Sequence, residues 1–481
     1  MLLFLLTGAL SFVSCQKEEE TPPNFIFFLT DDISFSDIGC YGNDFVHTPH
    51  IDRMAAGGLV FDNACLTASS CSPTRCSIIT SRYPHNTGAP ELHTPLPGNQ
   101  VMFPELLRQA GYYTVLSGKN HMGGVVERAF DTITGGGGPG HEQHWIPLLQ
   151  DRPRDKPFFC WFASVDAHRP WQFDSTAVRY DPDSVKVPPM LYDGPETRQD
   201  LAGFYHEVSR TDYYLGEIIK ELERQGIADQ TYIVYCGDNG RPFPRCKVRL
   251  YESGIKPPFI VTGPGVKKGR TGALVSVIDI GPTLLELAHV PRHPRMQGVS
   301  FKKILEEPAS ATRDFAFAEH NWHVYQGHER MVRFGDWMYI RNWFPDRRVM
   351  CVESAPVFPA GKELWEAYEE GRTRPEQEDI FQVSRPEEEL YHVADDPFQF
   401  DNLAGKQAYL DTLSFMREVM NCWVSETGDH VPDPITPDRE TLDRDQYEDF
   451  QRGEMAGARF GADTVTRTGP VYLQDVYPGN R

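Results

Sequence analysis

Four apolar runs, each followed directly by polar residues, constrain the fold of this chain more than any other feature. The runs are Asn24–Thr30, Tyr112–Leu116, Phe158–Val165 and Thr231–Cys236. Continuous apolar runs of this length are typical of strands buried on both faces of a parallel sheet. Helical patterns lie between them, notably over residues 201–225, where apolar residues recur on one face. The chain is therefore predicted to adopt an α/β fold with a doubly wound, mostly parallel sheet flanked by helices.

The polar residues after the runs are candidates for a metal site. Doubly wound sheets bind ligands beyond the carboxyl ends of their strands, so these residues should meet at one edge. Three carboxylates and one amide oxygen stand there, a set that suits Ca²⁺ or Mg²⁺ and suits Zn²⁺ poorly: Asp31, Asp32, Asp238 and Asn239. Taken singly, the first pair also fits a helix cap and the second pair a β-turn. Their joint placement predicts a metal site.

A cysteine motif, Cys71-Ser72-Pro73-Thr74-Arg75, stands between the first two apolar runs. Pro73 suits the first position of a helix that continues to Thr80, so Cys71 should lie at a helix N-terminus. The free amides and the positive end of the helix dipole would favour an anion there, with Arg75 one turn into the helix. The alternative is a structural cysteine buried before an ordinary helix.

Length and charge restrict the function further. A chain of 481 residues can form one large and one smaller domain. Its formal net charge is -21 and it has no Lys/Arg-rich run, which argues against a nucleic-acid partner. Such a chain repels polyanions at long range, so any anion site needs a local cluster of cations and metal.

The N-terminal residues predict export. Residues 1–14 are apolar but too short to span a bilayer, which is typical of a signal peptide. Phe12-Val13-Ser14-Cys15 resembles a bacterial lipobox, so Cys15 would carry lipid and residues 15–22 would form an acidic tether. We expect a periplasmic or cell-surface lipoprotein of a Gram-negative bacterium that contacts membrane only through this anchor, with plain secretion as the alternative.

Ten cysteines in an exported chain permit disulfides. Cys15 is assigned to lipid and Cys71 to the motif, and the pairing of the other eight cannot be read from the sequence. Cys160 and Cys236 lie within apolar runs and are expected to be small core residues.

The chain resembles the sulfatase family of the alkaline-phosphatase-like fold from Pro23 to about Cys422. The motif from Cys71 to Arg75 matches the Cys-x-Pro-x-Arg signature at which sulfatases convert a cysteine to formylglycine. Other segments similar to sulfatases are Thr48–Asp52, Lys247–Gly254, Ile278–Leu284, Glu389–Tyr391, Asp396-Pro397 and Asn402-Leu403. Within the family, Ser69–Arg75 and Asp238–Pro244 look most like the sulfamidases, which remove N-linked sulfate from glucosamine. Lys247 stands where animal sulfamidases have arginine, which leaves N- and O-sulfate both open.

The resemblance also implies a site. Cys71 would become formylglycine through a sulfatase-maturing enzyme and, once oxidised, would add an oxygen ligand to the metal. The four oxygen-bearing residues would hold Ca²⁺ rather than Mg²⁺, and five further residues would complete the site: Arg75, Lys119, His121, His168 and Lys247. The hydrated aldehyde would attack sulfur, His168 would protonate the leaving group, and His121 would accept a proton as sulfate is expelled.

A smaller α+β domain is expected from about residue 312. Residues Arg330–Arg341 predict a hairpin with a Gly-Asp turn, within a small antiparallel sheet followed by a helix. His320 and His323, together with Arg241, are candidate substrate contacts, although the block Glu319–His323 also fits a buried strand start. The expected divisions are a signal peptide (1–14), tether (15–22), catalytic domain (23–311), C-terminal domain (312–425) and extended acidic, proline-containing tail (426–481).

The resemblance implies a sulfatase that acts on a sulfated saccharide, with N- or O-sulfated glucosamine of heparin or heparan-type glycans expected. One alternative is an O-sulfatase for another host or algal glycan. A phosphoesterase of the same superfamily would use Ser or Thr as nucleophile and normally two zinc ions, and the Cys71 motif argues against it. A non-catalytic, glycan-binding lipoprotein would show the same sequence as an enzyme whose Cys71 is never matured.

Overall fold

The computed structural model describes residues 22–442, 444–452 and 454. An eight-stranded sheet in the order β4-β3-β5-β1-β6-β7-β2-β8 forms its centre. β7 is antiparallel to both neighbours, and the other strand pairs of this sheet are parallel. The predicted doubly wound, mostly parallel sheet is therefore confirmed. The strands are β1 (Asn24–Thr30), β2 (Leu59–Cys65), β3 (Tyr113–Gly118), β4 (Thr132–Thr134), β5 (Phe158–Ala163), β6 (Thr231–Gly237), β7 (Phe259–Thr262) and β8 (Gly269–Ser276).

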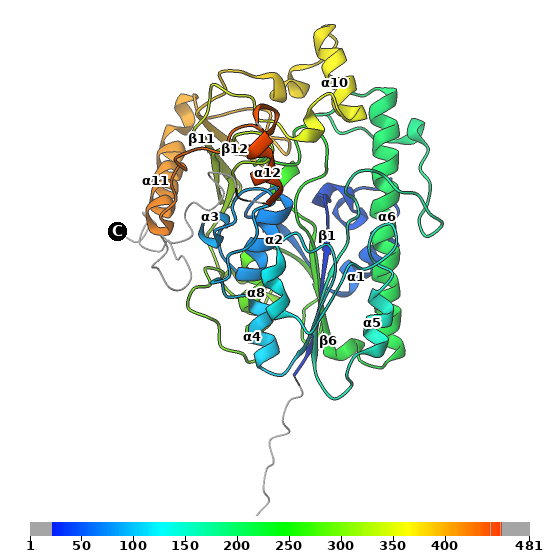
Figure 1. Ribbon diagram of the computed structural model, residues 1–481. Helices are drawn as coiled ribbons and strands as arrows, with labels where there is room; N and C mark the ends of the chain where they lie inside the picture. Colours follow the sequence, from blue (N-terminus) through cyan, green and yellow to red (C-terminus); the bar gives the residue numbers. More distant parts are fainter. Residues whose placement is uncertain (1–21, 443, 453, 455–481) are drawn as a thin grey trace, which may run out of the picture.

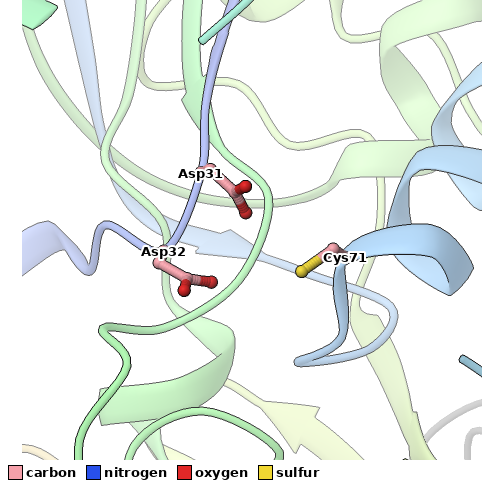
Figure 2. A group of neighbouring side chains, drawn as sticks. All are labelled: Asp31, Asp32 and Cys71. Atoms are coloured by element: carbon pink, nitrogen blue, oxygen red, sulfur yellow. The ribbon is translucent and has the colours of Figure 1, made fainter. Parts of the chain in front are cut away.

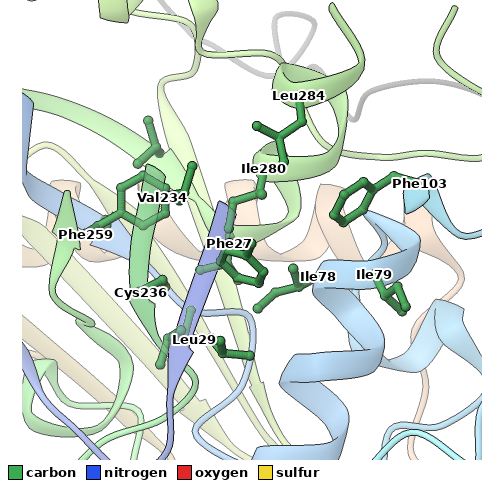
Figure 3. Packing of buried hydrophobic residues seen from close by; sticks show 14 of the residues in the cluster. Phe27, Leu29, Ile78, Ile79, Phe103, Val234, Cys236, Phe259, Ile280 and Leu284 are labelled. Carbon is green, nitrogen blue, oxygen red and sulfur yellow. The ribbon is translucent and has the colours of Figure 1, made fainter. Parts of the chain in front are cut away.

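Helices cover both faces of the sheet (Figure 1). On one face lie α2 (Cys71–Thr80), α4 (Phe103–Gln109) and α8 (Ile280–Leu287), and on the other α1 (Pro49–Gly57), α5 (Trp145–Asp151) and α6 (Pro195–Arg224). Side chains alternate along a strand, so β1 sends Phe27 to the first layer and Phe28 to the second. Figure 3 shows Phe27 and Leu29 packed beside Ile78 of α2. Burial on both faces explains why β1 is apolar throughout.

A second sheet has four antiparallel strands in the order β12-β11-β10-β9. It consists of β9 (Phe315–His320), β10 (Glu329–Phe334), β11 (Trp337–Asn342) and β12 (Glu388–His392). α11 (Leu410–Thr427) packs on this sheet, and its Trp423 stacks on Phe317 with ring centroids 4.9 Å apart. The predicted hairpin is confirmed as β10 and β11 joined by Gly335 and Asp336. The other α-helices of the described residues are α3 (Pro84–Thr87), α7 (Glu252–Ile255), α9 (Lys302–Glu306), α10 (Pro359–Glu369) and α12 (Arg444–Arg452), and short 3-10 helices lie between the elements.

Several predicted boundaries differ from those observed. α2 begins at Cys71, so Pro73 is its third residue and not its first. Amides of the first helical turn have no partner inside a helix, and a proline at the third position therefore costs no hydrogen bond. The first bond of the helix runs from Thr74 N to Ser70 O over 3.0 Å. β3 continues two residues beyond the predicted end at Leu116, and α6 begins six residues before 201, at Pro195.

The described cysteines are all free thiols. Cys160 and Cys236 are 1% and 0% exposed, which confirms the prediction that they are core residues. Cys15, the predicted signal peptide and residues 15–21 of the predicted tether lie outside the described residues. Within the described ranges, no helix has both the length and the hydropathy needed to cross a bilayer.

Candidate active site

The ends of β1 and β6 bring four oxygen-bearing side chains together. Asp31 and Asp32 follow β1 directly, and Asp238 and Asn239 follow β6, its neighbour in the sheet. The amide of Asp32 donates to Asp238 Oδ1 over 3.2 Å, which ties the two strand ends to each other. All four side chains are fully buried. The structure thus places these residues together, as the sequence predicted.

Cys71 lies at the N-terminus of α2, opposite the end of β1. Figure 2 shows the side chains of Asp31, Asp32 and Cys71 converging on one space. One carboxylate oxygen from each aspartate and Cys71 Sγ all lie within 4.8 Å of one another. Cys71 is 2% exposed, and this burial raises the pKa of its thiol above the ordinary value. The unmodified thiol therefore stays protonated and is a weak nucleophile.

Three cations neutralise the buried carboxylates. Arg75 Nε lies 2.8 Å from Asp238 Oδ2, Lys247 Nζ lies 2.8 Å from Asp32 Oδ1, and Lys119 pairs with Asp31. These are the three predicted basic residues of the site. They come from α2, the end of β3 and the loop after β6, so the fold gathers them from distant parts of the chain.

The cations decide which carboxylates of the site are ionised. Burial by itself raises the pKa of Asp31, but the charges of Lys119 and Arg75 outweigh burial and hold that pKa well below its ordinary value. For Asp32 and Asp238 burial dominates and raises each pKa to about 6. A further cation at this place would favour the ionised form of both groups.

The donor set fits a hard metal ion. Asp31 Oδ1 and Asn239 Oδ1 are buried and have no hydrogen-bond partner among the described residues. A buried acceptor left without a partner costs about 1–3 kcal/mol. Asn239 Nδ2 donates to Asp32 and to Gly240 O, an orientation that leaves Oδ1 available to a cation. Carboxylate and amide oxygens are the ligands that Ca²⁺ and Mg²⁺ prefer, so the residues suit such an ion.

The two predicted catalytic histidines both lie at this edge of the sheet. His168 Nδ1 is 2.6 Å from Arg169 O, and because a carbonyl only accepts, Nδ1 carries the proton. Burial and the charges of Lys247 and Lys119 lower the pKa of His168 to about 4. Burial, followed by Lys119, lowers the pKa of His121 well below its ordinary value. Both imidazoles are therefore neutral in the free protein.

Two residues of the site were not predicted from the sequence. His93 Nδ1 lies 2.7 Å from His121 Nε2, so the two imidazoles share a hydrogen bond. Glu353 Oε1 lies 3.7 Å from Lys247 Nζ. His93 stands in an irregular segment and Glu353 in the one-turn 3-10 helix Val352–Ser354. Neither segment has an apolar periodicity, and no local sequence signal distinguishes the two residues from surface residues.

The candidate substrate contacts have different surroundings. His323 is buried, and its Nδ1 lies 2.7 Å from Ser70 Oγ, next to Cys71 in the chain. His320 Nδ1 lies 2.7 Å from Glu329 Oε2. Arg241 pairs with Asp37 over 2.9 Å and lines a separate cavity of about 320 Å³. The structure therefore brings His323 to the site and turns Arg241 toward another part of the molecule.

The described part of the predicted tail runs along the loop that carries His323. Thr436 Oγ1 donates to Glu91 Oε2 over 2.7 Å, two residues before His93. Trp322 Nε1 donates to Pro437 O, and Arg439 N donates to Val324 O, both over 2.8 Å. This segment thus holds two loops that each contribute a histidine to the site.

Known proteins with similar sequences are sulfatases. Human N-sulphoglucosamine sulphohydrolase is 29% identical over 467 residues, covering 87% of this chain and 92% of that protein. An ulvan-active sulfatase of Formosa agariphila is 27% identical over 477 residues, covering 88% and 77%. A solved structure in complex with its substrate D-glucosamine-2-N,6-O-disulfate superposes with a TM-score of 0.68 at 20% identity, covering 86% of this chain and 100% of the other. At that identity the superposition shows a shared fold.

Two family models match the chain. The model described as Sulfatase matches residues 23–148 and 143–290, which is more than half of the chain and includes Cys71. The model described as N-sulphoglucosamine sulphohydrolase, C-terminal, matches residues 246–337. With these matches and a buried Cys71 facing Asp31 and Asp32, the chain belongs to the sulfatase family of hydrolases, which cleave sulfate esters or sulfamates.

Proposed function

We propose that this protein removes sulfate from N-sulfated glucosamine, with formylglycine made from Cys71 as the source of the nucleophile and Ca²⁺ as the metal. One observation carries the proposal: Cys71 Sγ and one oxygen each of Asp31 and Asp32 lie within 4.8 Å of one another. A thiol is a poor partner for two carboxylates around a hard cation, whereas an oxidised, hydroxyl-bearing side chain supplies a suitable oxygen. A sulfatase-maturing enzyme would have to make that change.

The cations of the site have a direct role in this reaction. When hydrated, the aldehyde would supply a hydroxyl that can attack sulfur, and Ca²⁺ held by Asp31, Asp32, Asp238 and Asn239 would supply positive charge beside the sulfuryl oxygens. Lys119 and Lys247 are positioned at Asp31 and Asp32, where they can donate hydrogen bonds to the same oxygens. Arg75 holds Asp238 in place. These positive charges attract the sulfate group locally and so offset the long-range repulsion between an anionic substrate and a chain of net charge -21.

His168 is proposed to protonate the leaving atom. Its Nδ1–H bonds Arg169 O, so Nε2 is the atom that exchanges a proton. In the free protein burial, Lys247 and Lys119 lower its pKa to about 4. A bound sulfate would offset the charges of both lysines and raise this pKa, so that substrate binding itself prepares the acid. His121, neutral and hydrogen-bonded to His93, is the proposed base.

The substrate assignment rests on the relatives. The human relative that covers 87% of this chain carries the name N-sulphoglucosamine sulphohydrolase, and the C-terminal family model has the same name. O-sulfate on a glycan is the second candidate, because an ulvan-active sulfatase and an N-acetylglucosamine-6-O-sulfatase of Bacteroides thetaiotaomicron are 27% and 26% identical to the chain. Lys247 at the scissile group is compatible with either linkage.

Sulfate release distinguishes these candidates. Protein matured in a competent host should release sulfate from glucosamine 2-N-sulfate with a kcat/KM at least about tenfold above that for N-acetylglucosamine 6-O-sulfate or ulvan oligosaccharides. Cys71→Ala should abolish release from each of these substrates. A preference for either O-sulfated substrate would replace the first candidate with the second, and release by Cys71→Ala protein would refute the proposed nucleophile.

Calcium binding can be measured without activity. Asn239→Ala removes a proposed ligand oxygen and should weaken Ca²⁺ binding, measured by isothermal titration calorimetry, by about tenfold or more. Asn63→Ala is a matched control, because Asn63 donates to Gly272 O on the strand pair β2–β8, away from the proposed metal ligands. Equal Ca²⁺ affinity in the wild type and Asn239→Ala would contradict the proposed site.

Export and lipid attachment are a separate proposal. We infer from the lipobox resemblance that Cys15 is lipidated and that the mature protein begins there. Labelling of cells with a radioactive fatty acid should mark the wild type and not Cys15→Ala. Equal labelling of the two proteins, or none in either, would exclude the anchor.

A further inference from the structure

Glu353 is a buried carboxylate beside the proposed catalytic centre. It lies in the segment between β11 and α10, far in sequence from the motif residues. Its Oε1 is 3.7 Å from Lys247 Nζ, and Lys247 in turn lies 2.8 Å from Asp32 Oδ1. The residue is 6% exposed. Glu353 and the proposed metal ligand Asp32 thus share Lys247 as a partner.

One oxygen of this carboxylate is unused. Glu353 Oε2 is buried and has no hydrogen-bond partner among the described residues. Burial alone raises the pKa of Glu353, but the charge of Lys247 and, more weakly, a hydrogen bond from its own backbone amide outweigh burial, so the pKa falls below the ordinary value. An ionised carboxylate with an unpartnered buried oxygen is costly unless a donor from outside the chain completes it.

The neighbours of Glu353 indicate which part of a substrate would meet that oxygen. Lys247 is one of the cations available to the sulfate, and His168 is the proposed proton donor to the leaving atom. The negative charge of Glu353 acts to raise the pKa of both residues. A sulfate oxygen would be repelled by a carboxylate at this position, whereas an O–H or N–H group of the sugar would be attracted.

We propose that Glu353 recognises the sugar next to the scissile bond, with Oε2 accepting a hydrogen bond from a hydroxyl or amino group of the leaving saccharide. The inference rests on the proposed sulfatase function and adds a specificity determinant to it. The negative charge also disfavours a second sulfate on the neighbouring sugar atom. Glu353 would thereby select a hydrogen-bond donor beside the group that is removed and reject a second anion there.

Two substitutions separate recognition from structure. Glu353→Leu removes the acceptor, and Glu353→Gln keeps the size and one acceptor oxygen without the charge. Glu366→Gln on α10 is a matched control, because the Glu366 side chain is 54% exposed. For each protein, kcat/KM is measured with glucosamine 2-N-sulfate and with 4-nitrophenyl sulfate, whose leaving group has no hydroxyl or amino donor.

We expect Glu353→Leu to lower the ratio of the sugar kcat/KM to the aryl kcat/KM by about 10- to 100-fold, as for loss of a charged hydrogen bond. Glu353→Gln should lower the ratio by less, and Glu366→Gln should leave it at the wild-type value. A ratio that stays within about twofold in Glu353→Leu, even if both activities fall, would overturn the proposal and reduce Glu353 to a partner of Lys247.

A binding measurement separates failure of this inference from failure of the proposed function. In a Cys71→Ala background, Glu353→Leu should weaken binding of glucosamine 2-N-sulfate by about tenfold or more in calorimetry. A wild type that binds the sugar but releases no sulfate would refute the proposed function and leave this expectation in force. Equal affinity with and without Glu353, or no binding to the Cys71→Ala protein, would overturn the inference.

Discussion

At the level of single residues, most of the described buried carboxylates pair with a cation. Arg210 Nη2 donates to Asp166 Oδ1 over 2.7 Å, and Arg330 Nη2 donates to Asp429 Oδ1 over 2.8 Å. Glu91 is an exception, because no ion pair joins it to another described residue. It is 2% exposed and accepts a hydrogen bond from Thr436 Oγ1 over 2.7 Å. Burial raises the pKa of Glu91 to about 8, and the Thr436 hydrogen bond opposes this only in part.

This pKa predicts a pH-dependent stability. The folded protein holds the Glu91 proton up to about pH 8, whereas the unfolded chain releases it near the ordinary value of 4.5. The contribution to stability is therefore fully present below pH 4.5 and is lost as pH rises toward about 8. Glu91→Gln cannot ionise, so at pH 8 it should be more stable than the wild type by a few kcal/mol, on the order expected from such a shift.

Urea unfolding at pH 5 and pH 8 measures this difference. The gap in the free energy of unfolding between Glu91→Gln and the wild type should widen from pH 5 to pH 8. Glu369→Gln, a change at an exposed glutamate, serves as the control for altered net charge. A gap that stays the same at both pH values would show that Glu91 is ionised in the folded protein.

At the level of secondary structure, helix α6 supports the strand ends that form the site. Arg210 of α6 is fully buried and makes a two-pronged ion pair with Asp166, just beyond β5. The backbone of Asp166 is linked to the proposed metal ligand, because Asp31 N donates to Asp166 O over 2.9 Å. His168 follows two residues later. Helix α6 thereby helps to fix the positions of Asp31 and of the segment that carries His168.

Arg210→Met should destabilise the protein strongly. The change leaves the Asp166 carboxylate buried without its cation, and breaking a buried pair in this way costs about 3–5 kcal/mol. Lys220→Met on the same helix removes an ion pair with Glu217 whose side chains are 60% and 32% exposed, and should cost less than about 1 kcal/mol. Denaturant unfolding compares the two. A similar decrease in the free energy of unfolding in both variants would show that the buried pair does not stabilise the fold.

The sequence predicted these elements with unequal success, for physical reasons. The strands β1, β5 and β6 are apolar because both faces are covered, and their polar ends mark Asp31 and Asp238 without any tertiary information. His93 stands in an irregular segment and Glu353 in a one-turn 3-10 helix, and the course of both segments depends on contacts made elsewhere. The start of α2 was misplaced because proline is tolerated at any of the first helical positions.

At the level of the whole molecule, the second sheet packs against the loop that precedes α2. Glu319 N of β9 donates to Thr67 O over 2.8 Å, and His323 beyond β9 reaches Ser70 Oγ. The prediction of a large sheet followed by a small one is confirmed. The contact between the two parts was not predicted, because it joins residues some 250 positions apart and local sequence patterns do not encode such pairs. The loop before Cys71 is thereby held from both sides, by α2 and by the second sheet.

The mass of the peptide containing Cys71, determined together with sulfate release, tests whether this arrangement serves a formylglycine sulfatase. Protein made with a sulfatase-maturing enzyme should show the mass change for conversion of CH₂–SH to an aldehyde. Its rate of sulfate release from glucosamine 2-N-sulfate should rise in proportion to the converted fraction, and protein made without the maturing enzyme should be inactive. Sulfate release by protein with an intact Cys71 thiol, or a fully converted protein that releases no sulfate from any sulfated sugar, would contradict the proposed function.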